Sequence, residues 1–278
     1  MDRTMLKIQM LYDEMGKSEK KVADFIISHP SELLPLSITD LAEKSKSSEA
    51  TIVRFARRLG LSGYQELKIS IARESGKVID NHDVATEDTA FEIFEKVTND
   101  IYKSLEMTKQ SLSPEALENA AKAILDAKKV VIFGLGNSAS VAQDAGHKFF
   151  RAGCDASVFS DNHMQAIAAS HLNSGDVAIG ISHSGSSKDI VDALKIAKGQ
   201  GAKTISITNK GKSPIVKESD ITLFTSSMET EYTILGLNSR IAALTIIDTI
   251  YSYIVCRKTT DAENAIKSVE DALKGKKY

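Results

Sequence analysis

The chain has 278 residues, of which 42% are hydrophobic and 26% are charged. These proportions are typical of a soluble globular protein and exclude a wholly disordered or collagen-like chain. The net charge of −2 excludes an overall basic field, and two cysteines do not make a disulfide framework or a zinc site. The apolar stretch from Ile241 to Cys256 is interrupted by Asp248, so we expect it to be too short to span a bilayer. With no secretory leader pattern, we expect a cytoplasmic protein with no membrane partner, cofactor or metal.

Charge divides the chain into three parts. Residues 1–77 hold 13 Lys and Arg against 11 Asp and Glu, whereas residues 78–100 hold one Lys and seven acids. A helical spacing of apolar residues returns at Thr89, so part of this acidic stretch is expected to be a helix. We therefore predict a helical domain over 1–77, a partly helical acidic linker over 78–110 and a larger domain over 111–278.

Two successive helices are predicted in the middle of the first domain, after an earlier helix over 18–28 that ends at His29-Pro30. Residues 37–40 (SITD) have the pattern of a capping box, with Asp in place of the usual Glu. Residues 45–47 (SKS) form a short turn, and Ser48 can cap the next helix, which ends at Gly60. A short helix, a short turn and a second helix make the helix-turn-helix layout.

The second of these helices has an apolar and a polar side. Ile52, Phe55, Ala56 and Leu59 recur at the spacing of one buried face. The opposite side is expected to carry the polar and small residues Glu49, Ala50, Thr51, Arg54, Arg57 and Arg58. Such a helix can read base edges with its first turns and contact phosphates further along. The same pattern also fits an ordinary helix with a solvated charged face.

The stretch SITDLAEKSKSSEATIVRFARRLGLSGYQELK strongly resembles the DNA-binding domain of the RpiR family of bacterial transcription regulators. The resemblance implies double-stranded operator DNA as a partner. It places four residues at the DNA, namely Ser47, Ser48, Thr51 and Arg54. Arg58 is expected to contact phosphates, and Tyr64 and Lys68 are expected to contact the DNA backbone.

The pattern changes in the second half of the chain, where short β-branched runs alternate with helical stretches. The predicted strands are KKVVIFGLG, ASVFS, DVAIGIS, KTISITN and DITLFT, and a long apolar helix is predicted from Thr233 to Arg257. This alternation predicts a doubly wound parallel sheet, giving an α + α/β protein.

Two predicted strands end in loops suited to an anion. Gly134-Leu-Gly136 precedes a helix, but Ala139 stands where a dinucleotide fingerprint needs its third Gly, so we exclude NAD. The second loop, Ser182-His-Ser-Gly-Ser-Ser187, offers hydroxyls and helix N–H groups that suit a phosphate monoester. In an open α/β sheet, the two loops converge at the carboxyl ends of the strands. The alternative is a solvent-exposed serine-rich turn.

Together the loops resemble the signature of the SIS (sugar isomerase) domain, with Ser187 where Thr is commoner. Residues 161–165 (DNHMQ) and 238–240 (NSR) also resemble the RpiR arrangement. The resemblance implies a phosphorylated sugar as effector. Its expected contacts are Gly136, Asn137, Ser138, Ser182, His183, Ser184, Ser187 and Glu231.

An SIS domain either isomerises a phosphosugar or senses one. Isomerisation needs a base and an acid at the sugar, and the candidates are Glu229, Glu231, His163 and His183. The helix-turn-helix resemblance favours a ligand-responsive transcription regulator. The alternative is a phosphosugar isomerase with a helical accessory domain. Because one helix-turn-helix reads one half-site, we expect a homodimer or homotetramer.

Overall fold

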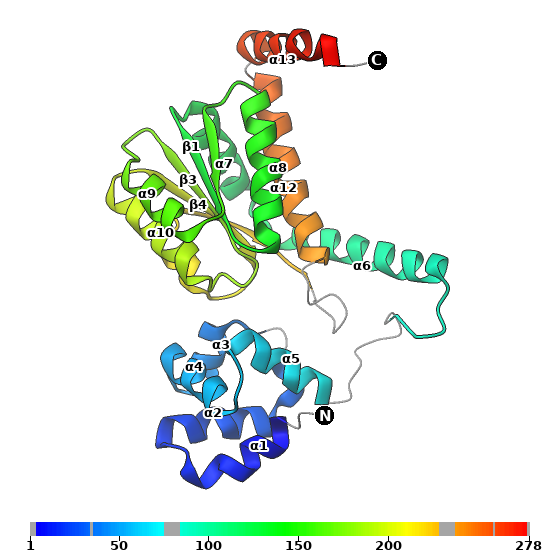
Figure 1. Cartoon of the computed structure of the whole chain (residues 1–278), viewed down its shortest axis with the longest axis vertical. Coiled ribbons are helices and arrows are strands. Elements are labelled where there is room, and N and C mark those ends of the chain that lie inside the picture. Colours follow the sequence, from blue (N-terminus) through cyan, green and yellow to red (C-terminus); the bar gives the residue numbers. More distant parts are fainter. Residues whose placement is uncertain (1–3, 34–35, 75–83, 228–236, 258, 277–278) are drawn as a thin grey trace. The chain divides into compact units, whose positions relative to one another are not determined.

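The computed structural model describes residues 4–33, 36–74, 84–227, 237–257 and 259–276. The chain forms two compact units. The first comprises Met1–Asp100 with two short later segments, Gly211–Ser213 and Met228–Leu237, and the second comprises the rest. Each unit is described separately below (Figure 1).

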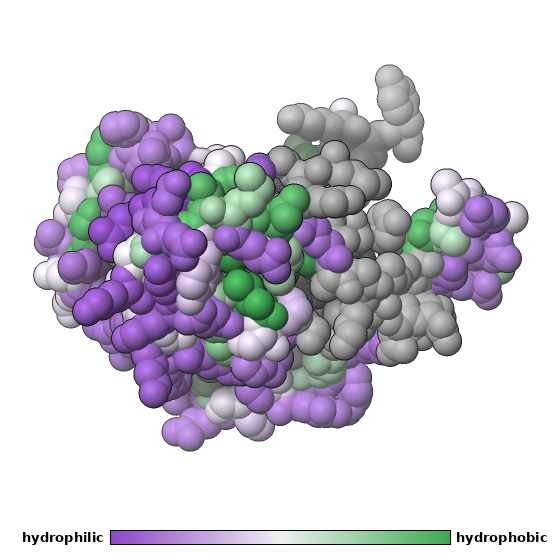
Figure 2. Space-filling view, turned by 90° about the horizontal axis from the view of Figure 1, so that it is seen from below, coloured by the Kyte–Doolittle hydropathy of each residue, from purple (hydrophilic) through white to green (hydrophobic). Residues whose placement is uncertain are grey.

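The first unit is a bundle of short helices, as predicted. It contains α1 (Thr4–Leu11), α2 (Lys17–Ser28), α3 (Ile38–Lys44), α4 (Glu49–Arg58) and α5 (Tyr64–Glu74). One apolar core joins all five, and its fully buried side chains include Ile8, Ile26, Leu41, Phe55 and Leu67. Figure 2 shows a largely hydrophilic surface in which hydrophobic residues form only small patches. This unit is therefore a small folded domain with its own core.

The predicted capping signals are confirmed at both central helices. The Ser37 hydroxyl accepts a hydrogen bond from the Asp40 amide, and the Asp40 carboxylate accepts one from the Ser37 amide at 3.2 Å. The Ser48 hydroxyl accepts the Thr51 amide at 3.2 Å and caps α4. Between the two helices Lys46 adopts φ +49, and after α4 Gly60 adopts φ +84. These local features set the bounds of the helix-turn-helix.

Helix α6 (Ala90–Ser111) lies where a helix was expected after Thr89, whereas the predicted linker over 78–110 stays a prediction. Its second half packs on the second unit, where the buried hydroxyls of Ser104 and Thr108 donate to the Ser226 carbonyl at 3.3 and 3.2 Å. Its first half exposes Phe91 and Phe94, whose rings stack with centroids 6.2 Å apart. The helix thus belongs to the second unit from Ile101 onward.

The second unit is built on a five-stranded sheet whose strands are all those predicted. They are β1 (Val130–Gly134), β2 (Ala156–Phe159), β3 (Val177–Ile181), β4 (Lys203–Asn209) and β5 (Ile221–Thr225). The strands are parallel in the order β2-β1-β3-β4-β5. The order reverses between β1 and β3, and the crevice at such a reversal is where open α/β sheets bind ligands.

Helices cover both faces of this sheet, which confirms the doubly wound prediction (Figure 1). One face packs against α7 (Pro114–Asp126), α8 (Asn137–Arg151) and α12 (Leu237–Arg257). The other packs against α9 (Asn162–Ser170), α10 (Lys188–Gly199) and α11 (Pro214–Lys217). A further helix, α13 (Thr259–Leu273), follows α12.

Helix α12 corrects one sequence expectation. From Asn238 to Arg257 it is long and apolar enough to cross a membrane by length and composition, so the prediction that the segment is too short was wrong. One side of the helix, which carries Ile246, Ile247 and Ile250, is buried in the core against the sheet, and 39% of the apolar window is buried. Asp248 pairs with Lys148 of α8. These contacts place one side of the helix in the core of the second unit.

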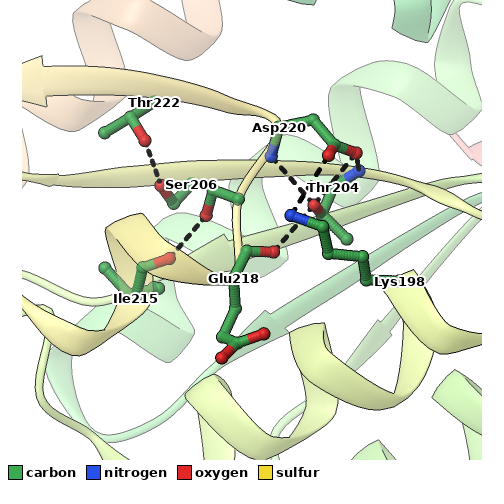
Figure 3. Close-up of polar contacts among 8 residues, drawn as sticks. Lys198, Thr204, Ser206, Ile215, Glu218, Asp220 and Thr222 are labelled. Atoms are coloured by element: carbon green, nitrogen blue, oxygen red, sulfur yellow. Dashed lines mark hydrogen bonds and ion pairs between the residues drawn. The ribbon is translucent and has the colours of Figure 1, made fainter.

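The edge of the sheet at β4 and β5 is held by a polar network that joins the buried hydroxyls of Thr204 and Ser206 to the exposed Asp220 and Lys198 (Figure 3). The Asp220 carboxylate accepts the Thr204 amide at 3.0 Å and pairs with Lys198 of α10 at 3.3 Å. The Ser206 hydroxyl donates to that of Thr222 across the two strands at 3.2 Å. Burial opposes ionisation of Asp220, but its hydrogen bonds and Lys198 outweigh this and hold its pKa below the usual value.

Candidate DNA-binding helix and ligand-binding loops

Helix α4 presents the polar side that the sequence predicts, with one exception. Ser48, Ala50, Arg54, Arg57 and Arg58 are exposed, and the apolar stripe of Ile52, Phe55, Ala56 and Leu59 is buried. With three arginines on its solvent-facing side, the helix can contact both base edges and phosphates.

Thr51 is the exception. It is only 3% exposed, so the expectation that it faces away from the core was wrong. Thr51 lies four residues before Phe55 and therefore on the flank of the buried stripe. Its hydroxyl lies 2.9 Å from that of Ser48 and 3.4 Å from an Arg54 guanidinium nitrogen. Thr51 thus supports the two exposed residues, Ser48 and Arg54, from behind.

The remaining predicted DNA contacts have partners within the unit. Tyr64 is 8% exposed, so its side chain is not the solvent-facing group that the sequence interpretation required. Its hydroxyl donates to the Leu36 carbonyl at 2.9 Å, and the Lys68 ammonium donates to the same carbonyl at 3.0 Å. Burial raises the Tyr64 pKa well above its usual range. Tyr64 therefore anchors α5 to the segment before α3.

Arg58 and Ser47 occupy the two ends of the exposed side of α4. The Arg58 guanidinium pairs with Glu19 of α2 at 3.3 Å and keeps 38% of its side chain exposed. Ser47 is half-buried, and its hydroxyl lies 2.8 Å from that of Ser45. Lys46 lies between Ser45 and Ser47, is exposed and has a positive φ, and the sequence analysis did not single it out. Ser48, Arg54 and Arg58 are thus the predicted DNA contacts that the structure leaves exposed.

In the second unit, both predicted loops lie at the carboxyl edge of the sheet, where the neighbouring strands β1 and β3 end and where an open α/β sheet forms its ligand crevice. The first joins β1 to α8, and Gly136 caps the helix at φ +53. Asn137 is exposed and Ser138 is half-buried at the first turn of α8. A Cβ on Gly134 would lie 2.7 Å from the Ser138 carbonyl oxygen, so this position requires glycine. The glycine therefore allows α8 to pack closely against the end of β1.

The second loop joins β3 to α10 and turns at Gly185, where φ is +63. The hydroxyls of Ser182 and Ser187 lie 3.0 Å apart, so both ends of the loop point to one place. Ser184 and Ser186 are half-buried, and the Ser184 hydroxyl accepts the Ser186 amide at 3.3 Å. Since α10 has no side-chain cap on its N-terminus, its first N–H groups add to these donors.

The loop is anchored to the neighbouring strand through the backbone of His183. The His183 carbonyl accepts the Asn209 amide at 3.0 Å and the Thr208 hydroxyl at 3.3 Å. The Asn209 carboxamide oxygen in turn accepts the Ser227 amide at 3.1 Å. Sequence reasoning missed Asn209, although its place at the end of the predicted strand KTISITN was a usable signal.

The structure describes two of the four candidates for catalysis. His163 is exposed at the start of α9, and His183 is half-buried in the second loop. Glu229 and the predicted sugar contact Glu231 lie outside the described residues. A cavity of about 350 Å³ lies at the opposite, amino edge of the sheet and is lined by Asp126, Asp176, Lys203 and Asp220 among others. None of the predicted site residues lines it.

Comparison with known proteins covers both units. Residues 3–77 match the helix-turn-helix domain of the rpiR family, and residues 123–253 match the SIS domain. An HTH-type transcriptional regulator of Caldanaerobacter subterraneus is 37% identical over 97% of this chain and 96% of its own length. HTH-type transcriptional regulator HexR of Pseudomonas aeruginosa is 32% identical over 100% of this chain and 98% of its own length.

A solved structure shares the fold of the whole chain. The Vibrio vulnificus NanR protein complexed with ManNAc-6P superposes with a TM-score of 0.81 at 22% identity, over 99% of this chain and 100% of that one. At this identity the likeness concerns the fold. With both domain matches in order along the chain and full-length relatives above 30% identity, the chain belongs to the RpiR family of helix-turn-helix transcriptional regulators.

Proposed function

We propose that this regulator binds operator DNA through α4 and changes its DNA affinity when a phosphosugar binds between the β1–α8 and β3–α10 loops. The observation that carries the proposal is the second loop, where the Ser182 and Ser187 hydroxyls converge at 3.0 Å beside the open N-terminus of α10. These groups are neutral hydrogen-bond donors, which suit a phosphate monoester. NanR, whose structure was solved with ManNAc-6P, supports the same class of ligand.

The DNA side of the proposal rests on Arg54, which is exposed on α4 and touches the Thr51 hydroxyl. Arg54→Ala should weaken operator binding roughly 5- to 150-fold, since one base contact is worth about 1–3 kcal/mol. Lys21→Ala is the matched control, because it removes an exposed positive charge from α2 of the same unit. Equal affinities of both variants at fixed salt would contradict the placement of α4 at the DNA.

The ligand side is tested by Ser184→Ala. The variant should bind operator normally without ligand and should lose its response to a phosphosugar, because losing a donor to a charged phosphate costs about 1.5–3 kcal/mol. Operator affinity of wild type and variant is measured across titrations with aldose and ketose phosphates. A wild type that responds to no member of the panel contradicts the sensor assignment.

We further propose that the chain does not catalyse isomerisation, that it acts in the cytoplasm and that it is a homodimer or homotetramer. Exposed aromatic residues on α6, Phe91, Phe94 and Tyr102, provide free apolar surface for assembly. Interconversion of an aldose and a ketose phosphate by the purified protein would contradict the first statement. A monomer by light scattering, with intact operator binding, would contradict the third.

A further inference from the structure

The segment Asp161-Asn-His-Met-Gln165 resembles its family counterpart, yet the proposed function assigns it no role. Asp161 caps α9 by accepting the Met164 amide at 3.0 Å, and the Asp161 carbonyl accepts the Gln165 amide at 2.9 Å. Asp161 is thus a structural cap. The first turn of α9 leaves His163 exposed and turns Gln165 into the protein, where it is 0% exposed. Gln165 is therefore the inward-facing member of the segment.

The orientation of the Gln165 carboxamide follows from its neighbours. Its nitrogen donates to the Phe159 carbonyl at 2.9 Å and approaches the Gly134 carbonyl at 3.4 Å. Exchanging the two amide atoms would place an oxygen against both carbonyl oxygens, so the nitrogen must face them. The two carbonyls belong to the last residues of β2 (Phe159) and β1 (Gly134). Gly134 also begins the first loop of the proposed site. The carboxamide thus joins the carboxyl ends of two strands beside the crevice.

The carboxamide oxygen of Gln165 is buried and has no hydrogen-bond partner in the part of the chain that the structure describes. Buried acceptors without a donor are uncommon in folded proteins, because the lost hydration is not replaced. A donor is therefore expected at this position in the working state of the protein. Because the Gln165 carboxamide lies at the end of β1, where the ligand is proposed to bind, the ligand is the natural source of this donor.

The chemistry of the missing partner selects one part of a phosphosugar. A phosphate monoester dianion carries only acceptor oxygens, which match the serine hydroxyls and helix N–H groups of the second loop. A sugar carries hydroxyl or amide N–H donors. We propose that the Gln165 oxygen accepts a hydrogen bond from the sugar part of the ligand, so that Gln165 is a specificity-determining residue that distinguishes a phosphosugar from phosphate alone.

This inference rests on the proposed function and adds a reason for a conformational response. The oxygen is buried in this structure, so a ligand reaches it only if the atoms that cover it shift. A ligand that supplies the missing donor favours the shifted state, and only such differential binding can change an equilibrium between two states.

The test compares two ligand classes in one protein. Wild type, Gln165→Met and Ser184→Ala are titrated by calorimetry with a panel of pentose and hexose phosphates and with methyl phosphate, a phosphate monoester that lacks hydroxyls. Gln165→Met should weaken the best sugar phosphate roughly 5- to 100-fold and change methyl phosphate less than twofold. Ser184→Ala should weaken both. This difference in selectivity is not expected of a residue that merely holds the loop.

Three results of the titrations overturn the inference. Equal weakening of both ligands by Gln165→Met would make Gln165 a structural support, and no weakening would remove it from the site. A wild type that binds no sugar phosphate would overturn the proposed function as well. Should Gln165→Met fail to fold, a crystal structure of wild type with the best sugar phosphate decides. A ligand donor within about 3.2 Å of the Gln165 oxygen is expected, and a water or an empty position there refutes it.

Discussion

Tyr64→Phe separates a structural role of Tyr64 from a role at the DNA. The variant removes one buried hydroxyl, which donates to the Leu36 carbonyl at 2.9 Å and lies 3.4 Å from the Ser37 carbonyl. The Leu36 carbonyl keeps the Lys68 ammonium as a partner, so the loss should be that of an ordinary hydrogen bond, about 0.5–1.5 kcal/mol. The ring and its contact with the Lys68 ammonium, 5.6 Å from the centroid, remain. In a unit of this size, 1 kcal/mol lowers Tm by roughly 4–8 °C.

The same substitution has a signature at high pH. Burial, and next the charge of Asp40, raise the Tyr64 pKa above its usual value of 10.0. Below pH 10 the phenol is protonated in both states, and its stabilising contribution is fully present. Above that pH only the unfolded state releases the proton, so stability falls by about 1.4 kcal/mol per pH unit until the folded pKa is reached. Tyr64→Phe should remove this part of the alkaline loss of stability.

The assay is amide hydrogen exchange, measured from pH 7 up to the alkaline range. Peptides from α3 and α5 report on the helical unit by itself. Operator affinity at fixed salt is measured in parallel. We expect lower protection at pH 7, a flatter alkaline profile and an operator affinity within about twofold of wild type. If Tyr64→Phe left protection unchanged but weakened operator binding as much as Arg54→Ala, the assignment of Tyr64 to the core of the unit would be refuted.

Three further substitutions test the second unit. Gly134→Ala should lower the Tm of this unit and weaken phosphosugar binding, because its Cβ would lie 2.7 Å from the Ser138 carbonyl oxygen. The expected loss of unfolding free energy is about 1–3 kcal/mol. An unchanged Tm would contradict the tight approach of α8 to β1. Asp220→Asn should cost about 0.5–1.5 kcal/mol in urea unfolding, because it leaves the Thr204 amide and Lys198 with a weaker partner at a partly exposed edge. Because the pKa of Asp220 is lowered in the folded state, its contribution to stability is fully present above the unfolded value of 3.8. That contribution is lost as the pH falls through the folded pKa. The variant should therefore lose less stability in acid than the wild type. Lys148→Met should reduce stability, since it leaves Asp144 and Asp248 without their shared cation; a rise in Tm would show that the packing of the methylene groups outweighs the charge contacts.

The sequence by itself determined the elements and their order, because their signals are local. Five β-branched runs became the five parallel strands, and the Ser37–Asp40 capping box and the terminal Gly60 mark helix ends as expected. Such signals depend on neighbours a few residues apart, so they survive any tertiary arrangement. The two loops at the crevice could be located for the same reason, because a loop between a parallel strand and a helix must lie at the carboxyl edge.

Tertiary structure decided which side chains remain accessible. Thr51 and Tyr64 are polar residues next to the predicted DNA surface, yet both are buried, and the Tyr64 hydroxyl donates to Leu36, 28 residues earlier in the chain. Arg58 meets Glu19, 39 residues earlier in the chain, and no periodicity within α4 encodes that pair. Gln165 shows the same limit, since its neighbours are the ends of two strands that only the folded sheet brings side by side. The burial of a side chain and the pairing of its polar atoms depend on contacts from the whole unit. Local sequence pattern specifies only the contacts between residues that are near in the chain.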